Sequence, residues 1–201
     1  MIARLVAGLA LVGLLTGCIY GVPTDVSVVT YPVTGTTFDA LKHSWTINGP
    51  RIGEDPDGAF ASVLPAFKSN FVPVQQGDRC IFSPKGEVYL DAEVTLPKWQ
   101  EQSVAPPEVR LRWDVYASYA VIHEGEHIKI SQKYARRLKS YLRNASAKDC
   151  DLLLRRMHRD TQQILEAHYA EQQWFDETDP PRFDEYRMRY LNRLFRTTNP
   201  S

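Results

Sequence analysis

The segment His123-Glu124-Gly125-Glu126-His127 contains the residue types needed to hold a metal ion and to activate water. On an α-helix, side chains four residues apart point in the same direction, so both imidazoles can reach one metal ion. The carboxylate of Glu124 can accept a proton from water without binding the metal itself. The spacing therefore predicts a zinc site with His123 and His127 as ligands and Glu124 as the catalytic base.

The alternative is an exposed helix that carries two solvated histidines. Steps of three or four residues, however, place both histidines among apolar and aromatic side chains, which is typical of a helix face that points to a core. This stripe consists of Tyr116, Ala120, His123, His127, Ile130, Tyr134, Leu138 and Tyr141. Buried imidazoles need polar partners, and one metal ion satisfies both. We therefore favour the metal site.

Two long helical segments must position this motif. Pro106-Pro107 fits the start of a helix, because proline has no N–H group and the first turn of a helix needs none. The helical pattern continues to about Asn144, and a short link at residues 145–147 leads to a second helix from about 149 to 178.

Pro180-Pro181 ends the second helix, and a third, arginine-rich helix is predicted over residues 183–196. A solvated helix face is the ordinary interpretation of so many arginines, and contact with an anionic surface is the alternative. We favour the solvated face.

A catalytic zinc ion normally has three protein ligands and a water molecule, so HEGEH is one ligand short. If the two long helices fold back on each other near Ser146, the motif lies level with residues 165–169. His168 falls in this range on the inward stripe and is our first choice. The alternative for His168 is a hydrogen-bonded histidine of the core.

Two carboxylates are further candidates for the third ligand. Glu171 lies one turn beyond His168 in the sequence. Asp176 lies about 12 Å beyond His168 along the helix, at 1.5 Å per residue. This distance counts against Asp176 unless the helix ends early.

The region before residue 106 has the alternation and turn residues of strands. Residues 87–96 alternate strictly between apolar and polar side chains, and Ser83-Pro84-Lys85-Gly86 predicts a hairpin turn to an antiparallel partner at 79–82. This strand is also a possible edge to which an extended peptide could add. Residues 26–31 predict another strand, and 37–45 a short helix capped by Thr36 or Thr37.

Cys80 and Cys150 form an even pair once Cys18 is assigned to the export signal described below. In an oxidising compartment such a pair predicts a disulfide. It would close a loop of about 70 residues and stabilise the fold by about 4 kcal/mol. Two free buried thiols, or ligands of a second metal, are weaker alternatives because neither residue belongs to a Cys-x-x-Cys motif.

Residues 1–17 have the features of a secretion signal: Arg4, and an apolar run from Leu5 to Leu15 that is too short to span a bilayer. The sequence Leu15-Thr16-Gly17-Cys18 resembles the bacterial lipobox, whose cysteine is lipidated. Ile19 after it, by resemblance to Gram-negative sorting rules, favours the outer membrane facing the periplasm. An ordinary signal peptide that happens to end near a cysteine is the alternative.

Residues 18–201 then form a single domain of 184 residues. The signal contains one Arg and no acidic residue, so this domain has 23 basic and 24 acidic side chains. Such a balance argues against binding to nucleic acid. We expect an α+β fold in which a small antiparallel sheet is followed by a long helical hairpin that carries HExxH and by a C-terminal helix.

The chain resembles a bacterial family of unknown function whose members are described as predicted secreted zinc-dependent proteases. The resemblance covers nearly the whole mature chain and is carried by Tyr31-Pro32-Val33-Thr34-Gly35-Thr36-Thr37, Asn48-Gly49-Pro50, Cys80, Leu96-Pro97-Lys98-Trp99, Trp113 and HEGEH. The family often has a Tyr-Asp-x-x-Thr-x-His-Gly element after the second helix. Residues 175–182 stand there in this chain, and they lack its histidine and glycine.

The residues and the resemblance together predict a lipid-anchored zinc metallopeptidase that acts on a peptide or protein substrate. Peptidoglycan cross-links are an alternative substrate. The competing hypothesis is a non-catalytic envelope lipoprotein whose HEGEH is a relic or a structural metal site, and the missing third ligand favours it.

Overall fold

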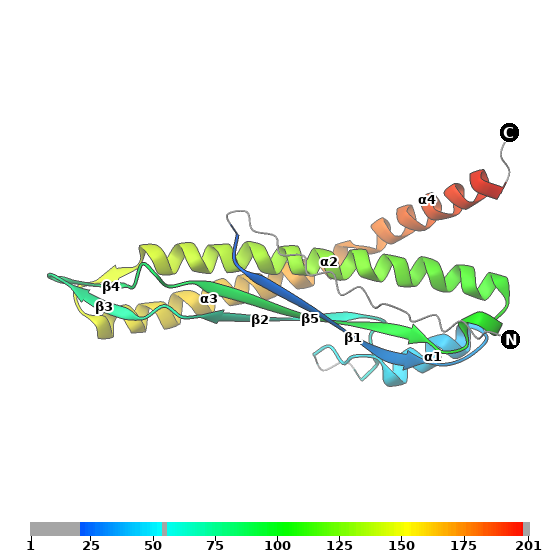
Figure 1. The fold of residues 1–201 in the computed structure, drawn as a ribbon, viewed down its shortest axis with the longest axis horizontal. Helices are drawn as coiled ribbons and strands as arrows, with labels where there is room; N and C mark the ends of the chain where they lie inside the picture. Colours follow the sequence, from blue (N-terminus) through cyan, green and yellow to red (C-terminus); the bar gives the residue numbers. More distant parts are fainter. Residues whose placement is uncertain (1–20, 54–55, 199–201) are drawn as a thin grey trace, which may run out of the picture.

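The computed structural model describes residues 21–53 and 56–198, and it has the predicted α+β fold. The elements, in chain order, are β1 (Thr24–Val33), α1 (Phe38–Asn48), β2 (Ser62–Ser69), β3 (Pro73–Gln76), β4 (Arg79–Phe82), β5 (Val88–Trp99), the 3-10 helix η1 (Gln102–Val104), α2 (Pro107–Asn144), β6 (Ser146–Ala147), α3 (Cys150–Thr178) and α4 (Pro180–Thr198). Figure 1 shows that α2 and α3 run side by side along the strands, while α4 points away from them.

β5 is the central strand of a three-stranded sheet with the order β1-β5-β2. It is antiparallel to β2 but parallel to β1, so the expectation of a purely antiparallel sheet is wrong. With a neighbour on each side, β5 has no free backbone edge, and the substrate-binding edge predicted for it is wrong too. Its alternation is confirmed by four buried side chains, those of Val88, Leu90, Ala92 and Val94.

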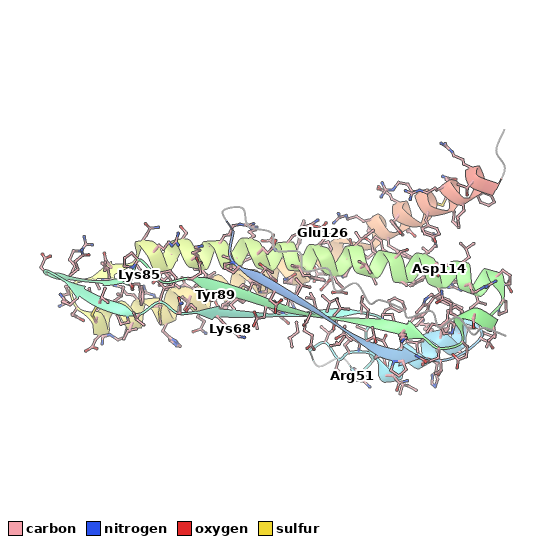
Figure 2. The ribbon with its side chains drawn as sticks, viewed as in Figure 1. Arg51, Lys68, Lys85, Tyr89, Asp114 and Glu126 are labelled. Atoms are coloured by element: carbon pink, nitrogen blue, oxygen red, sulfur yellow. A yellow bond between two sulfur atoms is a disulfide. The ribbon has the colours of Figure 1, made fainter. Side chains whose placement is uncertain are left out.

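The outer face of this sheet is exposed and carries charged and polar side chains together with the apolar Leu64 and Val29. Lys68 on β2 and Tyr89 on β5 lie opposite each other on adjacent strands (Figure 2). Lys68 forms an ion pair with Asp91, which is two residues further along β5. The sheet therefore buries one face against the helices and leaves the other in water.

β4 does not pair with β5, so the predicted hairpin across residues 83–86 is wrong. β4 lies instead between β3 and β6 in a second sheet. β6 is part of the link between α2 and α3, and its residues pair with Cys80 and Ile81. The predicted disulfide is confirmed, with the Cα atoms of Cys80 and Cys150 5.1 Å apart. These two connections to distant segments determine where β4 lies.

The helix boundaries follow from local signals. The Thr37 side chain accepts a hydrogen bond from the Ala40 N–H at the start of α1, and the Asp149 side chain accepts one from Leu152 at the start of α3. α2 begins at Pro107, as expected. α4 begins at Pro180, three residues earlier than predicted, because the two prolines open this helix as well as ending α3.

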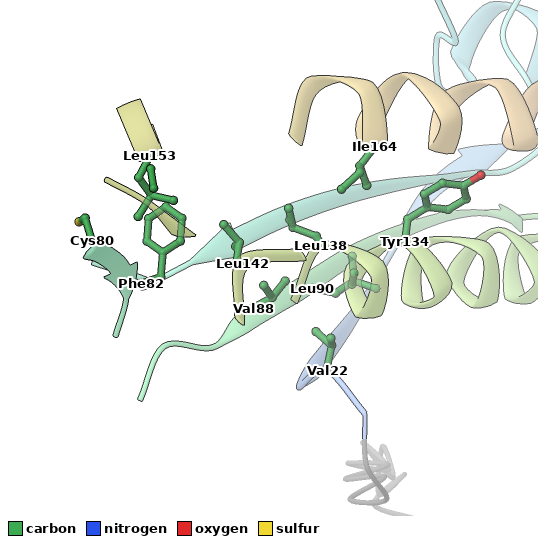
Figure 3. Packing of buried hydrophobic residues seen from close by; sticks show 12 residues of the cluster. Val22, Cys80, Phe82, Val88, Leu90, Tyr134, Leu138, Leu142, Leu153 and Ile164 are labelled. Carbon is green, nitrogen blue, oxygen red and sulfur yellow. The ribbon is translucent and has the colours of Figure 1, made fainter. Parts of the chain in front are cut away.

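The main apolar core lies between the inner face of β5 and the α2–α3 pair (Figure 3). Near the link, it contains Phe82 of β4, Leu142 of α2 and Leu153 of α3, and further along it contains Ile164 and Tyr134. A second, aromatic cluster joins α1 to the first turns of α2, and it includes Phe38, Trp45, Trp99 and Trp113. The two clusters hold α2 near both of its ends and leave its middle for other contacts.

Candidate metal centre

α2 carries HEGEH in the middle of its length, on the side that faces α3. His127 is 8% exposed and His123 is partly buried, which confirms that the stripe faces inward. Both rings lie against Phe175 of α3, at centroid distances of 4.9 Å for His123 and 5.0 Å for His127. This apolar contact limits the positions that the two imidazoles can adopt.

Asp176 of α3 lies beside both histidines. Its Oδ1 is 2.9 Å from His127 Nε2 and 3.2 Å from His123 Nε2. The two Nε2 atoms are themselves 3.0 Å apart. In the part of the chain that the structure describes, these three residues are the one group of histidine, cysteine and acidic side chains arranged to hold a metal ion.

The donor set fits zinc. Two imidazoles and one carboxylate are the ligands of several catalytic zinc sites, and they leave a fourth position open. Atoms about 2.0–2.2 Å from one zinc ion are roughly 3.3–3.6 Å apart at tetrahedral angles, so the three observed separations of 2.9–3.2 Å need to widen only slightly. The residues present can therefore bind the metal that the motif predicts.

His168, our first choice from the sequence, is not beside the Nε2 atoms. Its own Nε2 lies 3.0 Å from Ser131 Oγ and 2.8 Å from Gln172 Nε2. Glu171 is also elsewhere, because it pairs with Lys133 and accepts a hydrogen bond from Tyr134. Asp176, which the sequence disfavoured, takes the position expected of His168.

The reason lies in the offset between the two helices. Tyr141 contacts Asp160, and His127 contacts Gln172, so His127 lies opposite residue 172 and not near 165. The link forms β6 before α3 begins, and α3 starts beyond the end of α2 (Figure 1). The prediction assumes a symmetric hairpin that turns at Ser146. It leaves out this offset and therefore places the motif level with residues 165–169.

Asp179 holds the outer nitrogen of His123. Its Oδ2 accepts hydrogen bonds from His123 Nδ1 and from the Tyr119 hydroxyl, both at 2.8 Å. Asp179 is 5% exposed and lies between α3 and α4. Because a carboxylate only accepts hydrogen bonds, Nδ1 of His123 carries the proton, and a neutral ring presents a lone pair at Nε2.

Gln172 holds the outer nitrogen of His127 in the same way. Its Oε1 accepts a hydrogen bond from His127 Nδ1 at 2.5 Å, and its amide nitrogen donates to the His127 carbonyl and to Ser131 Oγ. His168 Nε2 lies 2.8 Å from the same amide nitrogen, whose two N–H groups are shared among these three neighbours. His168 is thus the hydrogen-bonded core histidine of the alternative interpretation, and it helps to orient Gln172.

His123, His127 and Asp176 form a cluster in which each side chain shifts the pKa of the others. Burial lowers the pKa of His123, but hydrogen bonds to Asp176 and Asp179 outweigh burial and raise this pKa to about 9. Burial also opposes protonation of His127, and the hydrogen bonds to Asp176 and Gln172 raise its pKa above the ordinary value. The two histidines lower the pKa of Asp176 despite its burial. Protons therefore balance the Asp176 charge when no metal does.

Glu124 differs from its neighbours. It is 4% exposed, and no hydrogen bond or ion pair to its side chain occurs within residues 21–53 and 56–198. Burial raises the pKa of its carboxyl, although the nearby His127 and His123 charges oppose the shift. A buried carboxylate without a partner is suited to exchange a proton with water.

Residues 28–180 match the model of a family described as a bacterial protein of unknown function, DUF922. The chain belongs to this family. The match extends from β1 to the start of α4 and includes HEGEH, Gln172, Asp176 and Asp179. No curated protein and no solved structure matched the chain.

Sequence reasoning missed Gln172 and Asp179 and disfavoured Asp176. One signal could have found them: residues 168, 172, 176 and 179 follow one another at steps of three or four, along one face of α3 and into its C-terminal cap. The histidine and glycine of the family element correspond to Pro181 and Arg182 here, in the first turn of α4.

The secretion signal at residues 1–17 and the lipidation site at Cys18 lie outside the described residues. Among the helices that the structure describes, none is both long and apolar enough to cross a membrane.

Proposed function

We propose that the chain is a lipid-anchored, zinc-dependent metallopeptidase of the bacterial envelope. One observation carries the proposal: the Nε2 atoms of His123 and His127 and a carboxylate oxygen of Asp176 converge within hydrogen-bonding distance of one another. Protein groups already occupy both Nδ1 atoms. A metal ion at this point would replace the protons that otherwise lie between the two Nε2 atoms and Asp176.

When bound, zinc would polarise the carbonyl of a peptide bond and make a water molecule more acidic. Glu124 would accept the proton of that water and pass it to the amine that leaves. Its lack of a hydrogen-bond partner in the described region leaves the carboxylate oxygens available for this transfer. Asp179 and Gln172 keep the two imidazoles in place throughout the reaction.

The location and the substrate rest on the sequence. Lipidation at Cys18 would attach the domain to the outer membrane, facing the periplasm, and the disulfide suits such an oxidising compartment. Asp176 is about half exposed, so the cluster is open to a peptide or protein, with peptidoglycan cross-links as the alternative substrate. Cys18→Ser should release the protein from washed membranes at high ionic strength, and retention there would contradict the anchor.

The test of catalysis compares two glutamates of the same motif. Glu124→Gln should keep zinc but reduce cleavage of a mixed peptide library by about 10²–10⁴-fold, because an amide cannot accept the proton. Glu126→Gln is the matched control, since Glu126 is paired with Lys129 on the surface of α2 (Figure 2). His123→Ala and His127→Ala should lose both zinc and activity.

One observation favours the non-catalytic alternative. Without a metal, the histidines and Asp176 already satisfy one another through hydrogen bonds, so the cluster could be a structural polar network. If the purified protein holds no zinc when zinc is supplied, this alternative replaces the enzyme. If zinc is present but Glu124→Gln is as active as the wild type, the site is structural.

A further inference from the structure

α4 combines a basic stripe with exposed apolar side chains in the part of the helix that projects from the body. From residue 187 to its end, α4 has four arginines and no acidic residue, although the chain as a whole is neutral. Figure 1 shows this end of α4 leading away from α2 and α3. The segment is therefore a local positive patch on an otherwise balanced protein.

The first half of α4 attaches the helix to the body. Phe183 packs on Tyr116 and Tyr119 of α2, with ring centroids 5.0 Å and 5.1 Å apart. Tyr186 contacts Tyr119 and donates a hydrogen bond of 2.8 Å to Ser118 Oγ. These contacts fix the direction in which the second half projects.

The basic stripe consists of Arg189, Arg193 and Arg196, which share one helix face because they are three or four residues apart. Arg189 lies 3.8 Å from Glu185. In the described part of the chain, neither Arg193 nor Arg196 has an ion-pair partner. Their charges are available to an external anion.

Exposed apolar side chains lie beside this stripe. Met188 is 54% exposed and Phe195 is 64% exposed, and their spacing of seven residues places both on one side of the helix. Leaving such side chains in water is unfavourable. A solvated helix, which we favoured from the sequence, explains the arginines but not these apolar neighbours.

We propose that the projecting half of α4 is a docking surface for an anionic lipid bilayer. A helix with arginines on one face and Met and Phe on another can lie in the interface, with its charges on lipid headgroups and its apolar side chains among the acyl chains. A second copy of the chain is disfavoured as the partner, because two such segments would repel each other. An anionic bilayer supplies negative charge for the arginines and an apolar interior for Met188 and Phe195.

The test uses the full mature chain with Cys18→Ser, so that no lipid anchor contributes, and measures cosedimentation with vesicles. The protein should bind vesicles of phosphatidylcholine with phosphatidylglycerol and should not bind phosphatidylcholine alone. Each arginine near an anionic surface strengthens binding by roughly fivefold, so Arg193→Gln/Arg196→Gln should weaken it by about 30-fold.

The matched control is Arg155→Gln/Arg156→Gln on α3, which removes the same charge from two exposed positions and should leave binding nearly unchanged. Met188→Ser, which keeps the charge, should also weaken binding. Circular dichroism confirms that each variant is folded.

Three results would overturn the proposal. They are equal binding to both kinds of vesicle, an equal loss in both arginine pairs, and binding that Met188→Ser does not change. Binding of an acidic protein in the absence of any vesicle binding would instead identify a protein partner. Zinc content does not enter this experiment, so its failure is distinct from a failure of the proposed enzyme.

Discussion

Along the α2–α3 pair, the interface near the link is apolar, whereas the interface near α4 is polar. Leu142 and Leu153 pack into the main core near the link, where the disulfide joins the start of α3 to β4. Further along, the same two helices meet through His127, Gln172 and Asp176. Two segments of one helix pair therefore bury their facing side chains in different ways.

The difference shows which end serves stability. Apolar contacts stabilise the folded state by removing surface from water, and a disulfide stabilises it mainly by restricting the unfolded chain. Buried polar networks contribute little net stability even when each group has a partner, because they first lose their contacts with water. In the described part of the chain, every fully buried polar side-chain atom has a partner. The composition of the polar end therefore supports the proposed metal site better than a role in stability.

Among the changes that test this comparison, removing the disulfide should have the largest effect. Cys80→Ser/Cys150→Ser should lower the free energy of unfolding by about 4 kcal/mol, because the bond closes a loop of 70 residues. Urea denaturation measures this change. The folded fraction should still bind zinc in full, because the histidines lie at the other end of the helix pair. A folded variant that has lost zinc would show that the two ends are not independent.

Removing the hydrogen-bond partner of His127 should have the opposite effect: zinc binding should weaken more than stability. Gln172→Leu removes the acceptor of His127 Nδ1, and zinc affinity should fall by about 10- to 100-fold. Competition with a zinc-binding dye measures the affinity. Gln173→Leu is the control, since the exposed Gln173 donates only to Tyr169 in the described region. Equal affinity of both variants for zinc would exclude a positioning role for Gln172.

An ion pair beside the apolar end should contribute least. Burial raises the pKa of the Glu87 carboxyl, but the hydrogen bonds from Lys139 at 2.6 Å and from the Val88 N–H, together with the charges of Lys139 and Arg143, lower this pKa below its usual value. A lowered pKa in the folded state stabilises the protein above the unfolded pKa, and this contribution disappears as the pH falls through the folded pKa. The loss should be at most about 1 kcal/mol.

Urea denaturation of the wild type and Glu87→Gln at about pH 7 and about pH 3 measures this contribution. The two proteins should differ at the higher pH and converge at the lower one. Glu93→Gln, on the exposed face of β5, should behave as the wild type at both. A constant difference between wild type and Glu87→Gln would show that Glu87 acts through packing and not through its charge.

Signals within a few residues determined much of this protein from sequence alone. Thr37, Pro107 and Asp149 mark helix starts where they were expected, and the alternation of β5 identified its buried face. The spacing of HEGEH placed two histidines on one side of a helix. The disulfide was predicted from Cys80 and Cys150, the pair that remains once Cys18 is assigned to the predicted signal. Each of these inferences depends on chemistry that the local sequence carries.

The strand partners and the third donor were decided by the tertiary structure. β5 pairs with β1 and β2 and not with β4, because β6 and the disulfide hold β4 at the end of the helices. Whether His168 or Asp176 meets the histidines depends on how far α3 is offset along α2. That offset is set by the link, the disulfide and the packing of the core. Segments distant in the sequence therefore fix it together, and no local pattern records it.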